Sequence, residues 1–215
     1  MSLPPQLTKN ASSSLAASLT RTSRSAPPLP DLLKQIKSSD DRVRTKAWQD
    51  AGRLGAPAVS PLAELTRHSD REVARAAKRG LWRIVRHTGR PGADRERRAV
   101  IPELVKILRA NYPDTFRRDV LWMLSEIAGA ESVNVIAAFL TNHTLREDAK
   151  AVLQRIPGQK SLKALESALL MAPKDFKLSL AQSLRQRGRA VPGLPCEKLK
   201  PVKKTDLKPL PKTSS

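Results

Sequence analysis

Arginine occurs at every fourth position over one stretch of this sequence, a spacing suited to binding anions. The members of this arginine row are Arg71, Arg75, Arg79 and Arg83. A helix turns by about 100° per residue, so it would place them along one slanting line. Each guanidinium offers a flat fork of N–H donors that fits carboxylate or phosphate oxygens. Trp82 borders the row, and its indole ring could stack on a nucleic-acid base. The predicted partner-binding residues are Arg71, Arg75, Lys78, Arg79, Trp82, Arg83, Arg86 and Arg90.

Other interpretations of these residues stay open at the level of sequence. A row of arginines on an exposed helix is often only its solvated side. Trp82 could instead cover a neighbouring helix beneath arginine stems, and Trp48 and Trp122 are expected to be packing residues. A loop predicted at residues 88–98 adds positive charge. Loops on rigid scaffolds often carry function, although an ordinary insertion is equally compatible with the sequence.

No catalytic or metal-binding constellation is recognisable in the sequence. The three histidines, His68, His87 and His143, are far apart and lack the spacing of metal ligands. The sequence has no phosphate-binding loop, nucleophile elbow or dinucleotide fingerprint. We therefore expect a protein that is not an enzyme and that uses no cofactor or metal.

An internal repeat defines the elements that must carry these side chains. An apolar anchor, in most copies followed by a basic residue, recurs five times, and a glycine follows each copy. The anchors are Val43, Val73, Phe116, Leu145 and Phe176, at intervals of 30, 43, 29 and 31 residues. Self-similarity with a period of roughly 20–50 residues is typical of solenoids. The repeat therefore predicts stacked units rather than one globular core.

Helical periodicity predicts two helices in each repeat, and no stretch alternates with the period of a strand. Two predicted capping boxes, Ser69-x-x-Glu72 and Thr144-x-x-Glu147, would begin second helices. The glycines expected in left-handed backbone at helix ends are Gly55, Gly129, Gly158 and Gly188. The predicted pairs are 29–37 with 41–54, 58–66 with 71–87, 95–110 with 114–128, 133–140 with 145–156, and 162–171 with 175–187.

Over residues 29–188 this pattern resembles HEAT repeats. In that family a proline often lies early in the first helix, as Pro61 and Pro102 do here. An Asp-x-Val-Arg-x-x-Ala-like stretch opens the second helix and is best matched by residues 41–47. The resemblance implies an all-α, right-handed, armadillo-type solenoid of about five helix pairs, with second helices along a concave surface. It implies little about function, because this fold carries scaffolds, transport factors and a few enzymes.

The later repeats depart from the family pattern. Position 143 is His143 and position 174 is Lys174 where the pattern has an acid, so a continuous Asp–Arg ladder is not expected there. Arg117 is expected to form structural hydrogen bonds between repeats. HEAT-like DNA glycosylases are a minor alternative, because they place a carboxylate and tryptophans at the lesion. The residues of this chain that would share such a helix face are Asp119, Trp122 and Glu126.

Positive charge dominates the chain, with 40 Lys and Arg against 20 Asp and Glu. Residues 67–98 hold eleven basic and four acidic residues, a local net charge of +7. Such a patch attracts acidic protein surfaces and polyanions alike. We therefore expect a scaffold that binds an acidic protein or peptide through a basic concave surface. Nucleic-acid binding is the alternative.

Two basic tails are expected to flank the repeats, and both have compositions typical of disorder. Residues 1–28 are rich in Ser and Pro and have some likeness to an organellar transit peptide, whereas residues 189–215 are rich in Pro and Lys. The lone Cys196 allows no internal disulfide and is compatible with a reducing compartment. We expect a cytoplasmic monomer without a membrane span.

Overall fold

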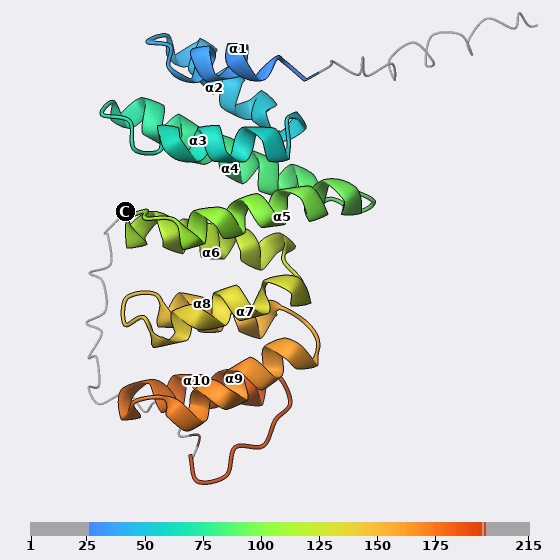
Figure 1. The fold of residues 1–215 in the computed structure, drawn as a ribbon, viewed down its shortest axis with the longest axis vertical. Coiled ribbons are helices and arrows are strands. Elements are labelled where there is room, and N and C mark those ends of the chain that lie inside the picture. Colours follow the sequence, from blue (N-terminus) through green and yellow to red (C-terminus); the bar gives the residue numbers. More distant parts are fainter. Residues whose placement is uncertain (1–25, 195, 197–215) are drawn as a thin grey trace, which may run out of the picture. The chain divides into compact units, whose positions relative to one another are not determined.

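The computed structural model describes residues 26–194 and 196 (Figure 1). Within this part of the chain there are ten α-helices, four short 3₁₀ helices and no strand, so the predicted all-α class is confirmed. The two predicted tails lie mostly outside the described residues. None of the helices in the described segments is both long and apolar enough to cross a bilayer. The chain divides into two compact units, Met1–Val100 and Ile101–Ser215.

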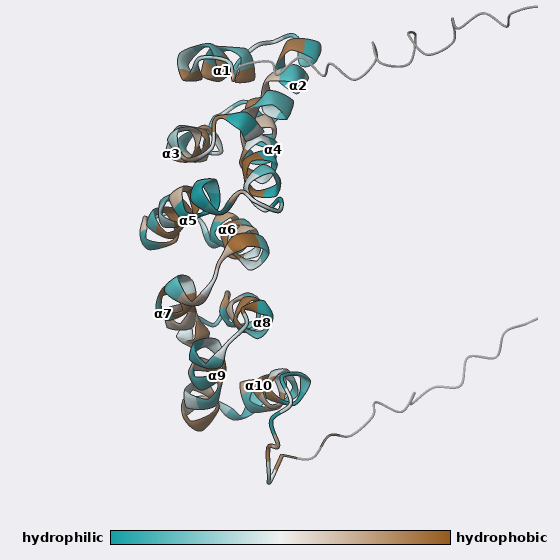
Figure 2. Ribbon diagram, turned by 90° about the vertical axis from the view of Figure 1, so that its right-hand side faces the viewer, coloured by the Kyte–Doolittle hydropathy of each residue, from teal (hydrophilic) through white to brown (hydrophobic). Residues whose placement is uncertain are grey.

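In the first unit, α4 is the helix that contacts most of the other elements. It packs against α2, η1 and α3, while α1 packs against α2. The elements are α1 (Leu29–Ile36), α2 (Asp41–Asp50), η1 (Ala51–Arg53), η2 (Ala56–Ala58), α3 (Val59–Leu65) and α4 (Arg71–Thr88), and α5 (Asp94–Arg109) includes the unit boundary. Helix α4 carries both hydrophobic and hydrophilic residues (Figure 2). Its buried side chains include Val73, Ala77, Leu81 and Ile84, as the helical period predicts.

Two small residues allow α4 and its neighbours to approach closely. A Cβ atom built at Gly80 would lie 3.2 Å from Cδ1 of Leu62 in α3 and 3.5 Å from Cβ of Ala51 in η1. A Cβ atom at Gly52 would lie 3.1 Å from the carbonyl oxygen of Arg83. Glycine at these positions therefore lets η1, and the end of α2 before it, lie directly on α4.

The second unit continues with further pairs of helices. Helix α8 contacts α6, α7, α9 and α10, and α9 also packs against α10. The elements are α6 (Asp114–Ile127), η3 (Ala130–Ser132), α7 (Val133–Ala137), η4 (Ala138–Thr141), α8 (Arg146–Arg155), α9 (Gln159–Met171) and α10 (Lys174–Gln186). Phe176 and Leu121 are among its largest fully buried side chains. Each predicted helix thus exists, but the predicted helix 133–140 is divided between α7 and η4.

Both predicted capping boxes are wrong in detail. The residue that caps α4 is Asp70, whose side chain accepts a hydrogen bond from the Glu72 amide at 2.7 Å. A carboxylate at this place also interacts favourably with the helix dipole, which the Ser69 hydroxyl would not do. Before α8, the Oδ1 atom of Asn142 accepts from the amides of Thr144 and Leu145, and the N-cap residue of the helix is Leu145, without a side-chain hydrogen bond.

The glycines predicted at helix ends differ from one another. Gly55, Gly158 and Gly188 have the expected positive φ angles, whereas Gly129 is extended, with φ of −119°. The prediction is therefore wrong for Gly129. Its amide donates to Oε1 of Glu131 at 2.8 Å, and a Cβ atom there would lie 2.7 Å from the other carboxylate oxygen. That carboxylate is the end of a flexible side chain and could move aside, so neither this contact nor left-handed backbone requires glycine here.

Arginines at equivalent repeat positions make equivalent local bonds. Arg44 donates to the carbonyl of Ser38 at 2.7 Å and pairs with Asp41 at 3.0 Å. Arg117 donates to the carbonyl of Ala110 at 3.2 Å and pairs with Asp114 at 3.5 Å. Each arginine thus joins the first turn of its helix to the turn before it. These bonds of Arg117 lie within its own predicted repeat, not between repeats as the sequence suggested.

Helix α10 offers a matched test of the core, because Leu180 is 0% exposed and Leu178 is 57% exposed. Leu180→Ala should reduce the free energy of unfolding by about 2–5 kcal/mol, since it removes buried methyl groups and leaves a cavity. Leu178→Ala should change it by about 0.5 kcal/mol or less. Urea unfolding followed by circular dichroism measures both, and equal effects would contradict the packing of α10.

Candidate functional site

An open hollow on the first unit brings two tryptophans and three arginines together. Its lining residues are Trp48, Arg79, Trp82, Arg83 and Arg86, and its volume is about 350 Å³. Trp48 comes from α2, whereas the other four residues come from α4. We call it the tryptophan–arginine hollow. Four of the eight predicted partner-binding residues line it.

Each indole in the hollow lies beneath a guanidinium group. The Cζ atom of Arg79 is 5.6 Å from the Trp48 ring centroid, and that of Arg86 is 5.8 Å from the Trp82 centroid. Each is a cation–π contact, in which the charged group is attracted to the electron-rich face of the ring. Such a contact uses none of the N–H donors of the guanidinium in a hydrogen bond, so they can still bond an acceptor.

Arg83 is positioned by the backbone of α2. Its Nε atom donates to the carbonyl oxygen of Gln49 at 3.3 Å, which joins α4 to the end of α2. The terminal nitrogens of the guanidinium are not used in this bond. All three arginines of the hollow are therefore oriented by α2 or by α4 itself, through a stacked ring or a backbone oxygen.

The arginines that line the hollow have no acidic partner within the described residues, whereas a neighbouring arginine has one. No carboxylate lines it, and within the described residues none pairs with Arg79, Arg83 or Arg86. By contrast, Arg75 pairs with Glu72 at 3.1 Å. The positive charge of the three lining arginines is thus uncompensated locally, which makes this place the strongest anion-binding candidate in the first unit.

The remaining predicted residues do not line the hollow. Arg75 is in its ion pair with Glu72, and Arg71 and Lys78 are exposed elsewhere on α4. Arg90 forms a two-pronged contact with Glu96, at 2.8 and 2.7 Å, and also donates to the carbonyl of His87. Of the predicted binding residues, only those in the central part of the stretch 71–90 therefore line the hollow.

Trp48 belongs to the site, although the sequence suggested packing. It is only partly buried and lines the hollow beside Arg79. The sequence carried no clear signal for this, because adjacent helical residues can both be buried, as Ile84 and Val85 are in α4.

A cluster of charged side chains lies at the C-terminal end of α4. Nε2 of His87 lies 3.8 Å from Oε2 of Glu96, which also binds Arg90. Burial lowers the pKa of His87, as does the charge of Arg90. The hydrogen bond from Arg90 lowers the pKa of Glu96. The predicted loop 88–98 is shorter than expected, because α5 begins at Asp94 with two acids in its first turn.

The possible glycosylase residues have structural partners in the second unit. Nε1 of Trp122 donates to Asp148 at 3.0 Å, and Asp148 also accepts from Arg118 at 2.8 Å. Glu126 pairs with Arg155 at 3.1 Å. These bonds tie α6 to α8, as packing contacts would. Across the described segments no group of acidic, histidine or cysteine side chains is placed to hold a metal ion.

Comparison with known proteins identifies no family for this chain. No family model matches the chain, and no curated protein matches it either. The assignment of a function therefore rests on the residues of the hollow.

The pKa of His87 tests the cluster at the end of α4. We expect it below the ordinary 6.5, so stability should be greatest above pH 6.5 and should fall as acid protonates this side chain. The Glu96 carboxylate opposes that shift, so Glu96→Gln should lower the pKa of His87 further. An NMR titration of both proteins measures this, and a higher pKa in the variant would refute the arrangement.

Proposed function

We propose that this protein is a non-enzymatic interaction module that binds an acidic protein or peptide segment at the tryptophan–arginine hollow. The observation that carries the proposal is the set of three oriented arginines, Arg79, Arg83 and Arg86, around one hollow whose lining holds no carboxylate. Asp and Glu side chains of the partner would supply the missing charge.

We also propose that the helix pairs form a right-handed HEAT-like solenoid. Support comes from the five predicted pairs, each of which exists as helices, and from the matching local bonds of Arg44 and Arg117. In such a solenoid the second helices line the concave surface, which would place α2 and α4 there. A rigid scaffold of this kind suits recognition of an extended partner segment.

Binding would use charge-assisted hydrogen bonds at the edges of the guanidinium groups. Stacking on Trp48 and Trp82 limits the rotamers of Arg79 and Arg86 before the partner arrives, so less side-chain entropy is lost on binding. Because the hollow is open to solvent, salt should weaken the interaction. The overall positive charge of the chain would mainly accelerate encounter with acidic partners.

Two observations favour an acidic protein segment over a nucleic acid. One face of each indole already carries a guanidinium, so that face is not open as a platform for a base. The flanking arginines, Arg75 and Arg90, are paired with acids, so the uncompensated charge is short rather than a continuous track for phosphates. The nucleic-acid alternative remains an outcome of the test.

The double variant Arg79→Glu/Arg83→Glu should bind a fluorescein-labelled poly-glutamate peptide at least about tenfold more weakly than the parent, because two contacts become repulsive. The matched control is Arg95→Glu/Arg98→Glu, which makes the same charge change at exposed positions of α5 outside the hollow. Fluorescence anisotropy at about 0.15 M salt gives the affinities.

Equal weakening by both double variants would mean that net charge, rather than the hollow, controls binding. Tighter binding of a single-stranded oligonucleotide than of the peptide, with a steep salt dependence lost in Arg79→Glu/Arg83→Glu, would replace the proposal by nucleic-acid binding. Circular dichroism of each variant checks that the helices are retained.

A further inference from the structure

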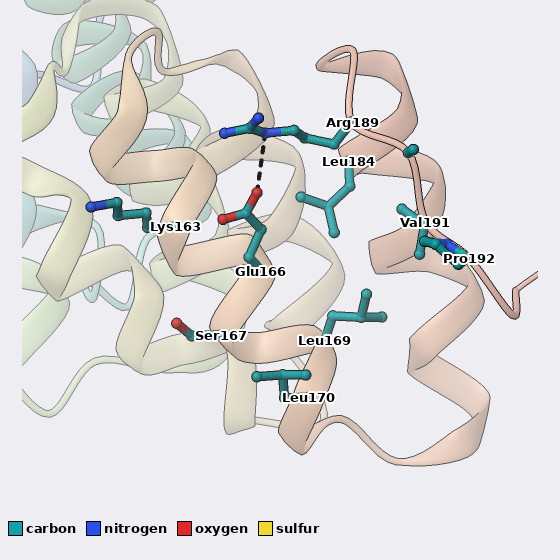
Figure 3. A pocket seen from close by; sticks show the side chains of 10 residues that line it. Lys163, Glu166, Ser167, Leu169, Leu170, Leu184, Arg189, Val191 and Pro192 are labelled. Carbon is teal, nitrogen blue, oxygen red and sulfur yellow. Dashed lines mark ion pairs between the residues drawn. The ribbon is translucent and has the colours of Figure 1, made fainter.

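A second hollow, which we call the α9 hollow, lies on the second unit and is largely apolar. It is lined by residues of α9, of α10 and of the segment after α10, and its volume is about 420 Å³ (Figure 3). Its apolar lining residues are Leu169, Leu170, Leu184, Ala190, Val191 and Pro192. Lys163, Glu166 and Arg189 add charged groups to this lining. The lining is thus mainly apolar and also carries a few charged side chains, a combination that is typical of ligand-binding pockets.

Residues 189–192 line one side of this hollow, and the segment that carries them is bonded to the helices. The amide of Arg189 donates to the carbonyl of Leu184 at 2.9 Å, and its side chain pairs with Glu166 of α9 at 3.1 Å, the dashed line in Figure 3. Arg185 also donates to the carbonyl of Leu194. The sequence assigned residues 189–194 to a tail, yet these bonds place them against α9 and α10. These bonds hold the lining residues in place, so the hollow is part of the folded second unit.

One large apolar side chain of this lining is strongly exposed. Leu170 is 79% exposed, near the end of α9. Exposed apolar groups that adjoin a concave apolar surface mark interaction sites more often than isolated ones do. Burial of Leu170 by a partner would remove this area from water, which favours association.

Charge decides which occupant fits the α9 hollow. Residues 159–194 contain seven basic and two acidic residues, a net charge of +5. The chain's own segments outside the described residues are also positive, +3 for 1–25 and +4 for 197–215, and a second copy carries +20. Like charges repel, so neither these segments nor another copy is complementary to the surface.

We propose that the α9 hollow binds an acidic segment of another protein through an apolar anchor side chain of leucine size. The anchor would enter between Leu169, Leu184 and Val191, and it would cover Leu170. Acidic residues beside the anchor would face Lys163, because Arg189 is already paired with Glu166. This second docking surface lies on other residues than the tryptophan–arginine hollow and is argued from its apolar lining, so it does not rest on the function proposed above.

The test uses two labelled peptides, one with paired leucines between glutamates and one with alanines in place of the leucines. The parent should bind the leucine peptide at least about tenfold more tightly than the alanine peptide. Leu170→Ser should remove that preference, whereas the control Leu178→Ser, at a 57% exposed position outside the lining, should keep it. Lys163→Glu should weaken binding of the leucine peptide while leaving the helical signal unchanged.

Equal binding of the two peptides by the parent would overturn the proposal. So would equal loss in Leu170→Ser and Leu178→Ser, equal binding of a lysine-flanked leucine peptide, or self-association that Leu170→Ser abolishes. Arg79→Glu/Arg83→Glu separates the two surfaces. If it retains the leucine preference, the α9 hollow acts independently; if it removes the preference and Leu170→Ser does not, this inference fails while the function proposed for the first unit stands.

Discussion

The close approach of α4 to its neighbours is the constraint on which the tryptophan–arginine hollow depends. Gly80 leaves no room for a Cβ atom against Leu62 without a shift, and Gly52 is equally close to the backbone of α4. This contact brings the end of α2 onto α4, so that Trp48 reaches Arg79 and the Gln49 carbonyl reaches Arg83. Wider separation would remove one wall of the hollow and the interactions that orient two of its arginines.

The acidic side chains decide which basic side chains of this surface keep an uncompensated positive charge. An excess of positive residues alone gives a diffuse field that attracts any polyanion. Glu72 and Glu96 pair with Arg75 and Arg90, whereas the arginines between them stack on indoles or bond a backbone oxygen. The anion-binding capacity is thereby concentrated at one place. On the second unit an apolar lining lies beside Lys163 and the Arg189–Glu166 pair, which suits the hydrophobic anchor proposed above.

Arginine has three distinct roles along this chain, and the partner of each side chain decides among them. Arg44 and Arg117 stabilise the turn before their own helices through a carbonyl and an aspartate. Arg118 joins α6 to α8 through Asp148, which also holds the Trp122 indole. Arg79 keeps its N–H edge available because a ring, not a carboxylate, contacts it. A count of basic residues could not separate these roles.

The sequence by itself determined the helices and the exposed side of α4, because hydrophobic periodicity, caps and turn residues act over one or two turns of chain. The ion pair of Arg75 with Glu72 is equally local, because the two residues are three apart on one helix. Only the tertiary structure decided that Trp48 lines the first hollow and that residues 189–192 line the second. Arg83 and Gln49 are 34 residues apart, and such contacts depend on how closely helices pack. Periodicity states which side of a helix is buried, but packing decides which neighbour it meets.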